Sequence, residues 1–85
     1  MDYEQFANQF SVEEHKEISR VVKILHEQKK NNKLGGMELR WLFDCWGKLF
    51  PKQKQSMSCQ GCRKAVYKFF SNLANYLDNK MHEIG

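Results

Sequence analysis

Several features that would place this chain outside the small helical proteins are scarce or missing. No stretch of its 85 residues approaches the ~18 consecutive apolar residues that a membrane-spanning helix needs. The first residues are acidic and lack the apolar segment of a secretory signal, so we expect a cytoplasmic protein. Three cysteines are an odd number, whereas a secreted disulfide scaffold usually has an even one. The length suits a single domain over residues 1–85 and excludes a two-domain enzyme with a cleft between its domains.

Patterns that carry catalysis are also missing from the sequence. We find no Ser-His-Asp arrangement, no glycine-rich phosphate loop and no paired catalytic carboxylates. Gly35 and Gly36 are better explained as a helix stop, because Glu38 just after them would repel a phosphate. We expect His15 and His26 to be surface residues. The sequence therefore predicts a binding protein and not an enzyme.

What is present is helical periodicity, beginning at the N-terminus. Tyr3, Phe6 and Phe10 are spaced i, i+3, i+7, which predicts a short first helix with one aromatic stripe. Ser11 and Glu14 form the Ser-x-x-Glu pattern of a capping box, in which each side chain satisfies an amide at the start of a helix. A second helix should therefore begin directly after Ser11.

Three longer stretches have apolar residues spaced by three and four, and no stretch has the alternation of a β-strand. Pro51 should end the middle helix, because the residue before a proline avoids the helical conformation. We predict an all-α fold, a small bundle of three main helices with a short N-terminal helix. The main helices are expected from Val12 to about Asn31, from about Met37 to Phe50 and from near Ser58 to about Met81.

The helix over 37–50 has an unusually wide apolar arc, roughly 240° of its circumference. Two neighbouring helices cannot cover so wide an arc, so the aromatic N-terminal turn or a second protein must cover the rest. Docking on a membrane surface is the third alternative, but the polar stripe has few basic residues. We predict protein binding or self-association through Trp41, Trp46 and Phe50, because tryptophan is enriched at binding hot spots.

Charge is uneven along the chain, and this favours a second function. Residues 1–17 have a net charge of −4, whereas six basic residues and no acidic one lie from Lys48 to Lys68. Such a one-signed stretch can bind phosphates, or it can be a solvated face that keeps the protein soluble. The linker of about seven residues is too long for a helix-turn-helix. The predicted nucleic-acid-binding residues are Lys52, Lys54, Arg63, Lys64 and Lys68.

The cysteines leave several chemistries open. Cys59 and Cys62 form a Cys-x-x-Cys pair at a helix start, where exposed amides favour a thiolate. The pair could act in redox chemistry, form a regulatory disulfide or fill the core as reduced thiols. A zinc site would need Cys45 as a third ligand and a histidine as the fourth. The candidate histidines are His82, His26 and His15. We expect no cofactor, with zinc as the alternative.

One segment resembles a known group of proteins. Leu49-Phe50-Pro51 is followed by Ser58-Cys59-Gln60-Gly61-Cys62-Arg63 and then by Val66 and Phe69-Phe70. This segment resembles one in small uncharacterised proteins of tailed bacteriophages, the crAss-like group among them. The resemblance implies a phage or mobile-element origin. It favours a virion component, a DNA-packaging or replication accessory, or an inhibitor of a host protein, located in the host cytoplasm or the virion.

Overall fold

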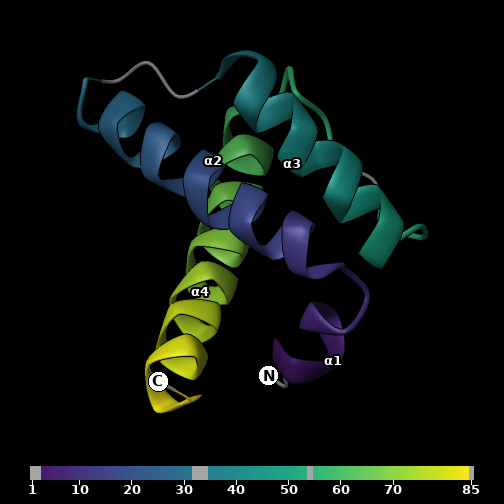
Figure 1. Cartoon of the computed structure of the whole chain (residues 1–85). Helices are drawn as coiled ribbons and strands as arrows, with labels where there is room; N and C mark the ends of the chain where they lie inside the picture. Colours follow the sequence, from purple (N-terminus) through teal and green to yellow (C-terminus); the bar gives the residue numbers. More distant parts are fainter. Residues whose placement is uncertain (1–2, 32–34, 54, 85) are drawn as a thin grey trace.

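The computed structural model describes residues 3–31, 35–53 and 55–84, with side chains to residue 79. The elements in chain order are α1 (Tyr3–Ala7), α2 (Val12–Lys30), α3 (Gly36–Leu49) and α4 (Gln60–Ile84). The described residues contain no strand, so the prediction of a small all-α bundle is confirmed. In Figure 1, α2 and α3 run in opposite directions, and α4 crosses behind α2. The three long helices pack pairwise, and α1 packs on α4.

The start of α2 is held by the capping box that its sequence predicts. Ser11 is the N-cap residue, and its hydroxyl accepts a hydrogen bond of 3.1 Å from the backbone N–H of Glu14. The Glu14 carboxylate accepts a bond of 2.9 Å from the backbone N–H of Ser11. These two bonds satisfy amides that the first turn leaves without helical partners. The whole predicted stripe of α2 is buried, namely Ile18, Val21, Val22 and Leu25.

The core lies where the apolar stripes of α2, α3 and α4 meet. Leu39 and Leu42 of α3 and Phe70 and Leu73 of α4 are fully buried. Among the described side chains no polar or charged one is buried. The core therefore depends on apolar contact, at about 25 cal/mol per Å² of area removed from water.

Three element boundaries differ from those expected, and one of them is the end of α4, at Ile84 instead of about Met81. The first helix ends at Ala7, so Phe10 lies in the turn after it, where it is nonetheless buried. The last helix begins at Gln60, because Ser58 belongs to a turn in which the Cys59 N–H bonds to the Ser56 carbonyl. Cys59 is consequently the residue that caps α4.

Candidate functional site

A basic groove lies between the C-terminal half of α2 and the N-terminal half of α4. Its volume is about 650 Å³. Residues of both helices line it, four of them lysines and none of them acidic. Its lining residues are His26, Lys29, Lys30, Lys64, Tyr67, Lys68, Ser71 and Asn72. We refer to this feature as the basic groove.

The positive charge of the basic groove is poorly compensated. Lys64 and Lys68 are exposed, and no carboxylate of the described residues lies within ion-pair distance of either. Lys30 pairs with Glu27 at 3.5 Å, but both side chains are more than half exposed, so the pair is weak. Lys29 lies with its Nζ 5.3 Å from the centre of the Tyr67 ring, a cation–π contact that leaves its charge in place.

Within the lining of the basic groove, one hydrogen bond joins the two helices. His26 Nδ1 and the Tyr67 hydroxyl are 3.2 Å apart, and Tyr67 is buried. This bond and the Lys29–Tyr67 contact both join α2 to α4, the two helices that carry the lysines. Ser71 and Asn72 add groups at the side of the groove that can hydrogen-bond to a ligand.

The residues predicted to bind nucleic acid do not all line the basic groove. Lys64 and Lys68 line the basic groove, whereas Lys52 and Arg63 do not. Lys54 lies outside the described residues. Sequence reasoning missed the contribution of α2, since Lys29 and Lys30 lie outside the basic stretch from Lys48 to Lys68. Two adjacent lysines near the end of a helix were the available signal, but the crossing of α2 and α4 is needed to interpret it.

An aromatic groove of about 470 Å³ lies between α3 and the segment after it. Trp46, Phe50 and Met57 line it, and each is half-buried. The Trp46 indole N–H donates a hydrogen bond of 2.7 Å to the Gln53 carbonyl, so the segment folds back over the ring. Phe43 lines the groove as well and is also half-buried.

Most of the wide apolar arc of α3 is covered within the chain. The Phe50 ring lies 5.3 Å from the ring of Phe6 in α1 and 5.4 Å from that of Phe69 in α4, between centroids. Trp46 packs against the same Phe69 ring at 5.5 Å. Trp41 is half-buried against the core and does not line the aromatic groove. Of the three residues predicted for a partner, Trp46 and Phe50 therefore line the aromatic groove and Trp41 does not.

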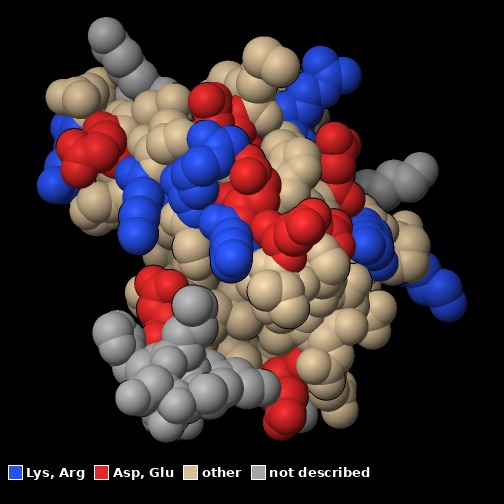
Figure 2. Space-filling view, viewed as in Figure 1, with Lys and Arg blue, Asp and Glu red and all other residues tan. Residues whose placement is uncertain are grey.

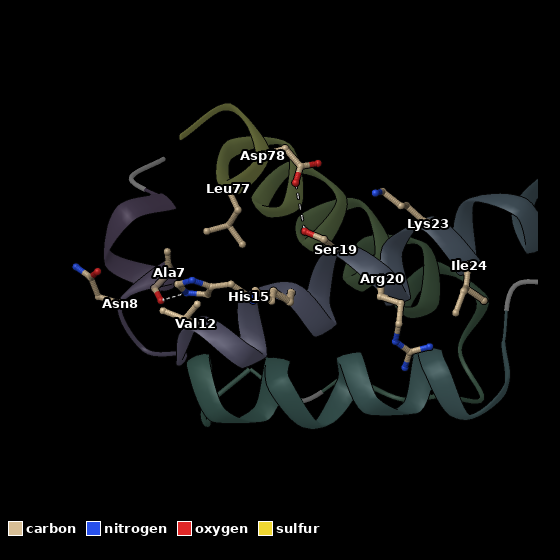
Figure 3. A pocket seen from close by; sticks show the side chains of 11 residues that line it. Ala7, Asn8, Val12, His15, Ser19, Arg20, Lys23, Ile24, Leu77 and Asp78 are labelled. Carbon is tan, nitrogen blue, oxygen red and sulfur yellow. Dashed lines mark hydrogen bonds between the residues drawn. The ribbon is translucent and has the colours of Figure 1, made fainter. Parts of the chain in front are cut away.

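A third groove, about 620 Å³ and mainly apolar, is lined by residues of α2, of α4 and of the α1–α2 junction (Figure 3). His15 Nε2 donates a hydrogen bond of 2.6 Å to the Ala7 carbonyl. The Ser19 hydroxyl donates to Asp78 Oδ1 at 3.4 Å. These polar groups are used to join elements to one another. We therefore assign His15 a structural role.

The cysteines fall into two environments. Cys45 is buried in the core, and burial raises the pKa of its thiol to about 12. Cys59 is exposed and Cys62 is half-buried at the start of α4. Nowhere in the described part of the chain do three histidine, cysteine or acidic side chains come together as metal ligands. Cys45 is thus not brought to the Cys59–Cys62 pair, and the His82 side chain lies outside the described residues.

Comparison of the chain with protein-family models, curated proteins and solved structures found no match. None of the described helices combines the length and apolar content needed to cross a bilayer.

Proposed function

We propose that this protein is a small non-enzymatic binding protein that holds nucleic acid by its phosphates in the basic groove. The observation that carries the proposal is the convergence of Lys29 and Lys30 of α2 with Lys64 and Lys68 of α4, without an acidic residue in the lining. Lysines held on two packed helices form a row of positive charge that attracts a polyanion.

The chemistry of the groove favours contact with the phosphate backbone over reading of bases. Lysine is a compact point charge on a flexible stem, so it neutralises phosphates without selecting a base. The one aromatic ring in the lining, Tyr67, is buried and gives little surface on which a base could stack. We therefore expect binding that depends strongly on salt and weakly on sequence.

The proposal is tested by measuring affinity for labelled duplex DNA, single-stranded DNA and RNA over a range of salt concentrations. Four neutralised phosphates give a slope of about −4 in log affinity against log salt for a duplex, and about −3 for a single strand. The double variant Lys64→Gln/Lys68→Gln should make the duplex slope shallower by about 2. The matched control is Lys16→Gln/Lys23→Gln, because it removes the same charge from exposed positions of α2 that do not line the groove.

A second pair of variants distinguishes the groove from the basic stretch seen in the sequence. Lys29→Gln/Lys30→Gln removes the contribution of α2, and Lys52→Gln/Arg63→Gln removes two residues that do not line the groove. We expect the first pair to weaken binding more than the second. Equal losses in all double variants would show a response to net charge alone. Failure to bind at the lowest salt would overturn the proposal.

A second candidate function is protein binding or self-association through the aromatic groove. It is favoured by the half-buried rings of Phe43, Trp46 and Phe50 around a concave surface. We place it second because Trp46 and Phe50 already pack against rings of this chain. The phage origin that the resemblance of the Cys-x-x-Cys segment implies stays a prediction and would suit a packaging or replication accessory.

A further inference from the structure

The first turn of α4 carries two thiols in one small region. Cys59 is the residue before the helix, and its sulfur accepts a hydrogen bond of 3.3 Å from the backbone N–H of Cys62. The Cys59 sulfur therefore takes the place that a serine hydroxyl has in an ordinary N-cap, and it is aimed at the residue that carries the second thiol. Cysteines with this i, i+3 spacing lie on the same face of the turn.

The sulfur of Cys59 is open to a reactant. Cys59 is exposed, and Cys62 is half-buried behind it. Gly61 lies between the two, and a Cβ built on it would be 4.0 Å from the Cys59 sulfur. Because glycine has no Cβ, this side of the sulfur is left uncovered.

The surroundings favour the thiolate at Cys59. Hydrogen bonds from the Cys62 thiol, and then from the backbone N–H groups of Cys62 and Gly61, lower the pKa of the Cys59 thiol. The positive charge of Arg63 acts in the same direction. A thiolate is the nucleophile in exchange with a disulfide, so the two cysteines have different roles. Cys59 is suited to attack a disulfide, and Cys62 is placed to resolve the mixed disulfide that this attack forms.

We propose that Cys59 and Cys62 form a stoichiometric thiol–disulfide exchange site that reduces small disulfides of the glutathione class. The Cys59 thiolate attacks one sulfur of glutathione disulfide, which forms a mixed disulfide and releases a glutathione thiolate. The Cys62 thiol loses its proton to solvent, and its sulfur attacks Cys59. This second step releases the other glutathione thiolate and leaves a Cys59–Cys62 disulfide. Two electrons pass from the protein dithiol to glutathione disulfide, which becomes two glutathione thiols.

The experiment follows intact mass after the reduced, folded protein is mixed with glutathione disulfide at low protein concentration. The wild type should lose the mass of two hydrogen atoms and retain no glutathione. Cys62→Ser should retain one glutathione, because the mixed disulfide on Cys59 cannot be resolved. Cys59→Ser should react about tenfold more slowly than the wild type or slower still, since the more nucleophilic thiol is gone.

The buried thiol supplies a matched control. Cys45→Ser removes a cysteine from the core, so a circular dichroism spectrum must first show that this variant is folded; Cys45→Ala replaces it if not. Either variant should react as the wild type does. Three results would overturn the proposal: a wild type that stays reduced, one that accumulates mixed disulfide or a disulfide-linked dimer, and a Cys59→Ser variant that reacts at the wild-type rate.

Discussion

At the residue scale, Glu14 shows how one side chain couples the fold to pH. The backbone N–H of Ser11 donates to the Glu14 carboxylate, and this bond lowers the pKa of Glu14 below its ordinary value of 4.5. The positive charge of Lys48, whose Nζ is 3.8 Å from Glu14 Oε2, acts in the same direction. The unfolded chain therefore binds a proton at this position more readily than the folded chain does.

The sign of the pH dependence follows from that difference. The contribution of Glu14 is complete above its ordinary pKa of 4.5 and is lost as the pH falls through the lower pKa of the folded state. In the Glu14→Gln variant the melting temperature should therefore fall less steeply as the pH is lowered into the acid range. Circular dichroism measures this melting temperature. Glu13→Gln is the control, because this exposed neighbour accepts no capping bond. The explanation fails if both variants follow the wild-type curve in acid.

At the element scale, the segment between α3 and α4 is tied to α3 by one tryptophan. The Trp46 N–H donates to Gln53 at 2.7 Å, and its ring lies 4.5 Å from that of Phe50. By contrast, no described group hydrogen-bonds to the Trp41 indole. The two tryptophans of α3 thus have similar burial but different polar contacts, which makes them a matched pair.

Trp46→Phe should lower the free energy of unfolding by about 1 kcal/mol, the usual net value of one hydrogen bond, while most ring contacts remain. Trp41→Phe should lower it by less, because it removes no such bond. Urea denaturation followed by circular dichroism measures both. If the two substitutions have the same effect, the bond to Gln53 does not stabilise the segment.

At the scale of the whole molecule, the mixture of basic and acidic side chains differs from one part of the surface to another. Figure 2 shows basic and acidic side chains interspersed over the face that α2 and α3 present. The basic groove differs from this face, since its lining has four lysines and no acid. The edge of the apolar arc of α3 near Phe50 is closed by α1, whose Phe6 ring contacts Phe50 and Phe69.

Because these rings are largely covered, we expect a monomer in light scattering at micromolar concentration. A dimer that Phe43→Ala weakens would favour the second candidate function instead. Phe43 is the appropriate residue to change, because it lines the aromatic groove but takes no part in the ring contacts of Phe6, Trp46, Phe50 and Phe69. A dimer that Phe43→Ala leaves intact would place the interface elsewhere.

Local pattern was enough to predict the helices, the Ser11 cap and the buried stripe of α2, because these depend on neighbours within one or two turns. The same pattern indicated Lys64 and Lys68, which share a face of one helix. It did not show which apolar residues of α3 would be covered, because that depends on where α1 and α4 pack.

Local sequence patterns alone predict an all-α chain, the capping box of α2 and the wide apolar arc of α3, because these follow from helical spacing. The packing of α2 against α4 is needed to bring Lys29 and Lys30 together with Lys64 and Lys68 around one groove. The physical reason is that helix crossings are set by contact between apolar stripes far apart in the chain. Charged side chains at the edges of those stripes are brought together only after the core has packed.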